Sequence, residues 1–196
     1  DGSGDYLTIP QNTALNFGTG DFTVECWVYP TSGLGGGGIS LLNLGQGAIG
    51  GSVYTGWGLL LEYLTSTTFT AGWYRYDGTT ETNLVTSSSV SLNQWSHIVA
   101  VRSGTTLSIY INGVRGYTGS NSLSYNNVNS NPLYIGYRYD GGGGDHYLNG
   151  YVSNSRIVKG TAVYDPTSTS ITIPTSPLTA VTNTQLLCNM SNGAIY

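Results

Sequence analysis

The chain has 196 residues, of which 39% are hydrophobic and 12% aromatic, but only 8% are charged. Globular domains carry about 25% charged residues, so the polar surface here must consist mainly of hydroxyl and amide groups. The net charge of −4 argues against a nucleic-acid partner or an anionic membrane surface, because both require a basic patch. No apolar run approaches the roughly 18 residues that span a bilayer, so we expect no membrane insertion.

Short alternating segments separated by Gly, Asn, Ser and Thr predict an all-β protein, because strands repeat every two residues and helical periodicity is almost absent. The expected strands are 5–9, 21–29, 39–44, 57–63, 68–76, 81–86, 95–102, 105–111, 114–118, 132–139, 147–158 and 184–190. About a dozen strands in a chain of this length predict a two-sheet sandwich that forms one domain over residues 1–196.

The segment DFTVECWVY at 21–29 gives the clearest alternation. One face carries Phe22, Val24, Cys26 and Val28, and the other carries Thr23, Glu25, Trp27 and Tyr29. We expect the first face to lie in the core and the second to keep large aromatic rings for a ligand or a covering segment.

Turn and loop signals connect these strands. The pair Asn112-Gly113 predicts a tight hairpin, because both turn residues must adopt positive φ. The Pro/Ser/Thr-rich segment 165–184 is expected to run extended over the surface towards the last strand. Cys26 and Cys188 either form one disulfide or remain buried thiols, and the sequence favours the thiols.

The pentapeptide YRYDG occurs twice, at 74–78 and at 137–141. In both copies the tyrosines share one strand face, the arginine takes the other, and Asp-Gly begins a turn. The first copy is explained as a hairpin end, whereas the second is followed by GGGGDHY. We therefore expect any ligand or calcium site at the second copy, with the first contributing at most a neighbouring aromatic wall.

The segment NQWSHIVAVRSGTTLSIYINGVRGY at 93–117 resembles the laminin-G-like branch of the concanavalin A-like lectin/glucanase superfamily. The residues that carry the resemblance are Trp95, His97, Arg102, Gly104, Tyr110, Asn112 and Gly113. The segment SNSRIVKGTAVYDP is most similar to such modules in large phage structural proteins. The resemblance implies a concanavalin A-like jelly roll with one concave face, and it implies that the N- and C-terminal strands lie side by side.

Hydrolases of that superfamily place catalytic carboxylates at alternating positions of one strand. The ten acids here are Asp1, Asp5, Asp21, Glu25, Glu62, Asp77, Glu81, Asp140, Asp145 and Asp165, and no two are separated by two positions. An enzyme is therefore not expected. His97 is predicted to support the sandwich through a hydrogen bond rather than to act as a base.

A sugar site needs flat aromatic faces beside planar polar groups. The candidate ligand-binding residues are Trp57, Trp73, Tyr74, Tyr76, Tyr137, Tyr139, Asp140, Asp145, His146 and Tyr147. The resemblance implies calcium as the ion, since hard Ca²⁺ prefers oxygen ligands at flexible turns. Its candidate ligands are Asp5, Asp140 and Asp145, and the resemblance implies that the strand beginning at Asp5 lies close to the 147–158 strand.

Two functions stay open. One is a calcium-dependent glycan-binding lectin domain. The other is a non-catalytic structural or adhesion module of a virion fibre or extracellular surface assembly, which contacts other copies of the same protein and can also bind carbohydrate. The low charge, the hydroxyl-rich surface and the resemblance favour the second, and they place the chain outside cells or on a virion surface.

Overall fold

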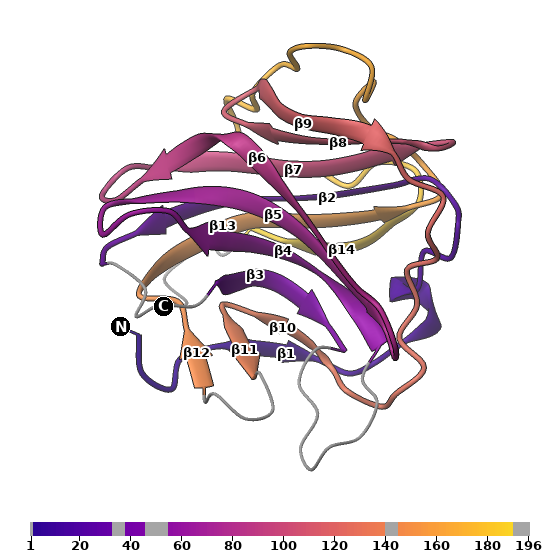
Figure 1. Cartoon of the computed structure of the whole chain (residues 1–196), viewed down its shortest axis with the longest axis horizontal. Coiled ribbons are helices and arrows are strands. Elements are labelled where there is room, and N and C mark those ends of the chain that lie inside the picture. Colours follow the sequence, from indigo (N-terminus) through magenta and orange to yellow (C-terminus); the bar gives the residue numbers. More distant parts are fainter. Residues whose placement is uncertain (1, 33–37, 46–54, 140–144, 190–196) are drawn as a thin grey trace, which may run out of the picture.

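The computed structural model describes residues 2–32, 38–45, 55–139 and 145–189, which form two six-stranded antiparallel sheets and a small hairpin (Figure 1). The first sheet has the order β1 (Leu7–Ile9), β10 (Leu133–Ile135), β3 (Ile39–Leu44), β4 (Thr55–Tyr63), β5 (Thr68–Asp77) and β6 (Glu81–Ser91). The second has the order β14 (Thr184–Cys188), β13 (Gly150–Lys159), β2 (Phe22–Pro30), β7 (Ser96–Ser103), β8 (Thr106–Ile111) and β9 (Val114–Ser120). The hairpin joins β11 (Tyr137–Tyr139) to β12 (Asp145–Tyr147). One short 3-10 helix, η1 (Thr13–Leu15), precedes β2. The predicted all-β two-sheet sandwich is confirmed.

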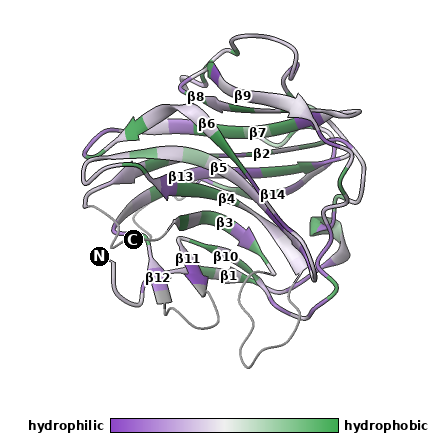
Figure 2. Ribbon diagram, viewed as in Figure 1, coloured by the Kyte–Doolittle hydropathy of each residue, from purple (hydrophilic) through white to green (hydrophobic). Residues whose placement is uncertain are grey.

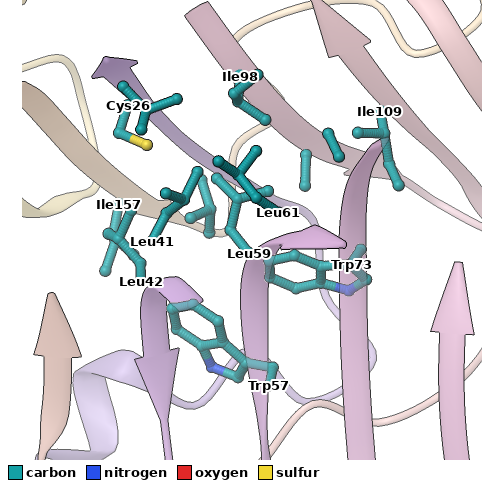
Figure 3. Packing of buried hydrophobic residues seen from close by; sticks show 14 of the residues in the cluster. Cys26, Leu41, Leu42, Trp57, Leu59, Leu61, Trp73, Ile98, Ile109 and Ile157 are labelled. Carbon is teal, nitrogen blue, oxygen red and sulfur yellow. The ribbon is translucent and has the colours of Figure 1, made fainter. Parts of the chain in front are cut away.

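The core lies between the sheets and follows from strand alternation. In β2 the four residues predicted to face inward, Phe22, Val24, Cys26 and Val28, are fully buried. They meet side chains of the first sheet such as Leu41, Leu59 and Leu61 (Figure 3). Figure 2 shows the central strands β3, β4 and β7 as largely hydrophobic, whereas β12 is hydrophilic. Apolar burial between the two sheets is therefore the main stabilising term.

Two predicted strands are each divided in the structure. The expected strand 132–139 breaks at Gly136, whose φ of 79° turns the chain out of the first sheet. The expected strand 147–158 separates into β12 and β13. The glycine thus ends β10 and lets β11 pair with β12 instead.

The turn at Asn112-Gly113 is confirmed, with φ values of 49° and 77° between β8 and β9. Asn112 also binds β7, because its Oδ1 accepts a hydrogen bond from the backbone N–H of His97 at 2.8 Å. Arg102, fully buried, lies 5.1 Å from the ring of Phe22 and 5.0 Å from that of Tyr125. Several residues that carry the family resemblance therefore hold the sandwich together.

Residues 160–183, which we call the covering segment, run over the outer face of the second sheet, as predicted for most of this range (Figure 1). Ala162, Tyr164 and Ile171 pack on Val99, Val101 and Tyr110 in a second, smaller hydrophobic cluster. The Tyr110 hydroxyl donates to the carbonyl oxygens of Asp165 and Ser168. The segment is thus fixed to the sheet by both apolar and polar contacts.

Beneath the covering segment lies a buried ionic group around Glu25. Its carboxylate accepts from His97 Nε2 at 2.9 Å, from Arg156 Nε at 2.8 Å and from the Tyr164 hydroxyl at 2.9 Å. Burial would raise the pKa of Glu25, but the hydrogen bonds and charges of His97 and Arg156 outweigh it and hold the pKa below its ordinary value. His97 is fully buried, so its predicted supporting hydrogen bond is confirmed.

The terminal strands do not lie side by side, contrary to the implication of the resemblance. β1 is an edge of the first sheet and β14 an edge of the second. β13 separates β14 from β2, so Cys26 and Cys188 lie on strands that do not pair. Both cysteines are free thiols, Cys26 buried and Cys188 half-buried. The described residues contain no helix long and apolar enough to cross a membrane.

Candidate functional site

Four tyrosines gather at one edge of the first sheet, and we call Tyr6, Tyr134, Tyr137 and Tyr147 the tyrosine cluster. The rings of Tyr6 and Tyr137 stack with centroids 4.7 Å apart and planes inclined by 23°. Tyr147 lies 4.9 Å and Tyr134 lies 5.1 Å from Tyr137. Tyr6 is 44% exposed, so its ring is accessible from solvent.

Two separate strand pairings bring these rings together. β1 pairs with β10 with Leu7 opposite Ile135, which places Tyr6 beside the end of β10. Directly opposite residues of an antiparallel pair share a face, and in the hairpin Tyr137 is opposite Tyr147. The cluster is therefore made by long-range pairing and by the hairpin that follows Gly136.

A cleft of about 380 Å³ adjoins the tyrosine cluster. It is lined by Gly4, Asp5, Tyr6, Leu7, Ile135, Gly136, Leu148, Gly150 and Val152. Burial and the neighbouring Tyr6 raise the pKa of Tyr134, so its phenol stays protonated at neutral pH. The Tyr6 ring, an apolar wall and Asp5 thus meet in one depression.

A polar row extends from the cluster across the outer face of the first sheet. The strand registers place Tyr134 opposite Asn43, Asn43 opposite Gly58, Gly58 opposite Tyr74, and Tyr74 opposite Asn83. Asn43 is fully buried, and within the described part of the chain neither its Nδ2 nor its Oδ1 has a hydrogen-bond partner. Unpaired buried amides are rare in folded proteins and call for a partner such as water or a ligand.

Trp57 and Trp73, predicted to line the site, lie in the core instead (Figure 3). Both are fully buried, their rings are 5.3 Å apart, and Trp57 Nε1 donates to the carbonyl of Leu15 at 2.9 Å. The physical reason is alternation, because Trp57 shares its face with Leu59 and Leu61. The prediction that they bind ligand is wrong.

The first YRYDG copy ends a hairpin, as predicted. β5 pairs with β6, and the Asp77 carboxylate accepts backbone hydrogen bonds from Thr79 and Thr80 in the turn. Arg75 shares a face with its opposite residue, Trp57, so Tyr74 and Tyr76 take the outer face. Tyr74 is three strand spacings from Tyr134, roughly 14 Å, and is therefore a neighbour of the cluster rather than a member.

The second copy lies at the tyrosine cluster. Tyr137 and Tyr147 belong to it, and the half-buried His146 is opposite Arg138 in the hairpin. The backbones of Tyr139 and Asp145 pair in the same hairpin, but their side chains are outside the described set. Asp140 lies outside the described residues altogether.

Of the three predicted calcium ligands, only Asp5 has a described side chain. It lines the cleft together with Leu7 of β1 and Val152 of β13, so the expected closeness of the strand that follows Asp5 to the 147–158 strand is confirmed. Among the described residues, no group of three or more His, Cys, Asp or Glu side chains is placed to hold a metal ion.

Sequence reasoning missed Tyr6, Tyr134 and Asn43. Alternation does put Tyr134 and Asn43 on outward faces, since Leu133, Ile135, Leu42 and Leu44 are core residues. What the sequence could not supply is the pairing of β1, β10 and β3, which brings residues more than a hundred positions apart onto one edge.

The sequence model of the concanavalin A-like lectin/glucanases superfamily matches residues 1–163. No curated protein matches the chain by sequence. Among solved structures, the sialidase module CBM40 of Ruminococcus gnavus aligns with a TM-score of 0.59 and 13% identity, over 83% of this chain and 93% of that one. Domain 4 of the arabinanase AbnA of Geobacillus stearothermophilus, in complex with arabinotriose, gives 0.58 and 17%, over 81% and 68%. The LG4-5 domains of mouse laminin alpha1 give 0.50 and 15%, over 80% and 39%.

Proposed function

The chain belongs to the concanavalin A-like lectin/glucanases superfamily, and from this premise we propose that it is a non-catalytic carbohydrate-binding module serving adhesion in an extracellular or virion-surface assembly. The observation that carries the proposal is the exposed Tyr6 ring, stacked on Tyr137 and bordering the Asp5 cleft. The carbohydrate complex of the arabinanase domain, which shares this fold, supports it.

The chemistry of the cleft suits a saccharide. The C–H face of a sugar ring stacks on the accessible face of Tyr6, and sugar hydroxyls donate to the Asp5 carboxylate. The Tyr134 phenol, which belongs to the adjoining tyrosine cluster and not to the cleft lining, can donate to or accept from a hydroxyl of a ligand that extends past Tyr6. One aromatic platform with a few polar groups is the usual composition of a saccharide site.

A non-catalytic role agrees with the positions of the acids. Hydrolysis of a glycosidic bond needs two carboxyl groups roughly 5–10 Å apart across the bond. In the described strand registers, no carboxylate lies opposite another, and Glu62 Oε1 on the outer face accepts a hydrogen bond from Asn83 Nδ2. These positions are consistent with recognition rather than cleavage.

Calcium is part of the proposal as an accessory ion. Asp5 would supply one hard oxygen ligand, and Asp140 and Asp145 flank a run of four glycines in the sequence. The ion would orient Asp5 and neutralise its charge beside a bound sugar. Chelation by EDTA and the variant Asp5→Asn should then weaken saccharide binding together.

A glycan-array screen with and without EDTA, followed by calorimetry on the best neutral oligosaccharide, tests the proposal. Tyr6→Ala is expected to weaken binding roughly tenfold or more. Tyr63→Ala is the matched control, because Tyr63 is an equally exposed tyrosine at the end of β4, outside the cleft. Absence of binding at millimolar saccharide, or self-association through the tyrosine cluster in sedimentation, would contradict carbohydrate recognition at this site.

A further inference from the structure

A second aromatic surface lies on the outer face of the second sheet. In β2 and β13, Tyr29 is opposite Tyr151, and their ring centroids are 6.1 Å apart. Trp95, which directly precedes β7, lies 5.6 Å from Tyr29. We call Trp95, Tyr29 and Tyr151 the aromatic row.

The aromatic row is open to solvent. Trp95 is 46% and Tyr151 is 64% exposed. Exposed aromatic residues that gather in one place, rather than scattering singly, are typical of a binding surface. The aromatic row lies on the part of the outer face that the covering segment does not cover.

Two clefts share Trp95 as a lining residue, and together we call them the groove. The first, of about 490 Å³, is lined by Tyr29, Thr31, Asn93, Trp95 and Tyr151. The second, of about 650 Å³, is lined by Trp27, Trp95, Ser153, Asn154 and residues 173–177 of the covering segment. Trp95 belongs to both linings, so a ligand chain lying along the groove would cross this ring.

The groove is uncharged. Its described lining residues are aromatic, aliphatic, hydroxyl or amide residues, and none is acidic or basic. A charged ligand would lose its hydration without gaining an opposite charge, whereas a neutral polyhydroxyl ligand matches both the rings and the polar groups.

The groove walls are held in place before any ligand binds. Asn154, at φ 50°, accepts from the backbone N–H of Leu178 and donates to the Ser153 hydroxyl. Asn93, at φ 58°, donates its backbone N–H to the Pro30 carbonyl at 2.7 Å. A preformed groove loses little conformational entropy on binding.

An extended peptide is a poorer fit than a saccharide. Peptides that bind β-sheets gain main-chain hydrogen bonds from an unpaired edge strand. The strands beneath this groove, β13, β2 and β7, are interior strands of the second sheet, and their backbone groups already serve their neighbours.

We propose that this groove is a second saccharide-binding site, which takes a neutral oligosaccharide chain across Trp95. The inference rests on the proposed carbohydrate-binding function and extends it to the outer face of the second sheet. The Asp5 cleft and the groove have no lining residue in common, so one domain can hold two glycan chains.

Tryptophan fluorescence tests the proposal selectively. The chain has four tryptophans, of which Trp57 and Trp73 are fully buried, while Trp27 and Trp95 line the groove. Titration with short neutral arabino-, gluco- and galacto-oligosaccharides should shift the emission and protect it from acrylamide quenching. Binding at the Asp5 cleft, which contains no tryptophan among its described lining residues, should leave the emission unchanged.

Variants separate the two sites. Trp95→Ala and Tyr151→Ala should each weaken the fluorescence-detected binding roughly tenfold, whereas Tyr6→Ala and the control Tyr63→Ala should not. Trp95→Phe keeps an aromatic platform and should retain most of the affinity, as measured by calorimetry. Retained affinity in Trp95→Phe would show that the loss in Trp95→Ala comes from the missing ring and not from misfolding.

The negative outcomes are also distinct. Saccharide binding lost only in Tyr6→Ala, with constant tryptophan emission, would overturn the second site and leave the proposed function intact. Self-association of the wild type that Trp95→Ala abolishes, without saccharide binding at the groove, would assign the groove to a second copy of the chain. Absence of all saccharide binding would overturn both proposals.

Discussion

The outer face of the second sheet has a buried half and a half-exposed half, and β2 contributes side chains to both. From β2, Thr23 and Glu25 point outward beneath the covering segment and are fully buried, whereas Trp27 and Tyr29 point outward where the segment leaves them half-exposed. In the covered half every polar group of Glu25 has a partner from another strand or from the segment. The covering segment therefore divides this face into a half that stabilises the fold and a half that we propose binds saccharide.

The covered half should give the largest loss of stability. Glu25→Gln removes the charge that balances the buried Arg156, and breaking a buried ion pair costs about 3–5 kcal/mol in the free energy of unfolding. Denaturant unfolding of Glu25→Gln and of the wild type measures this loss. Glu62→Gln is the control, because Glu62 is only partly buried and its described side-chain hydrogen bond is to Asn83; an equal loss in both variants would contradict a special role for the buried group.

The same carboxylate should make stability depend on pH. Because the folded pKa of Glu25 lies below the ordinary pKa of a glutamate, the stabilising contribution of Glu25 is present above that ordinary pKa and is lost as the pH falls through the folded pKa. Asp165, whose pKa is also lowered, acts in the same direction. The difference in unfolding free energy between wild type and Glu25→Gln should therefore shrink on acidification; a constant difference would count against the assigned pKa direction.

A smaller effect is expected from the covering segment's own contact. Tyr164→Phe removes one hydrogen bond to the charged Glu25 while keeping the ring that packs on Val99 and Val101. The loss should be about 1.5–3 kcal/mol, since the acceptor is ionised. Hydrogen exchange should show faster opening of residues 160–183, and unchanged protection there would show that the segment is held by apolar packing alone.

The uncovered half should give the smallest stability effect. Tyr151→Ala removes a mainly exposed ring and should change the unfolding free energy by no more than about 0.5 kcal/mol. Thermal unfolding checks this directly. A destabilisation comparable to that of Tyr164→Phe would mean that the aromatic row also stabilises the fold. The two halves would then not differ in their contribution to the free energy of unfolding.

The fold was largely predictable because its information is local. The inward and outward faces of β2, the Asn112-Gly113 turn and the strandless path of the covering segment all follow from alternation and turn chemistry. The break at Gly136 was missed, because a single glycine inside an alternating run is compatible with either a continuous strand or a sharp exit.

The candidate site was less predictable, for two different reasons. Grouping Trp73 with Tyr74 in one lining conflicts with alternation, since adjacent strand residues face opposite sides. That error could have been avoided from the sequence. The stacking of Tyr6 on Tyr137 could not have been predicted, because it depends on which distant strands pair, and no local sequence pattern specifies that pairing.

The two free thiols give the molecule internal reporters of its own unfolding. Burial raises the pKa of Cys26 and keeps its thiol unreactive in the native state. Cys188 lies half-buried on the edge strand β14. A thiol-labelling time course therefore gives two separate rates. The rate at Cys188 measures local opening of the sheet edge, and the rate at Cys26 measures complete separation of the two sheets.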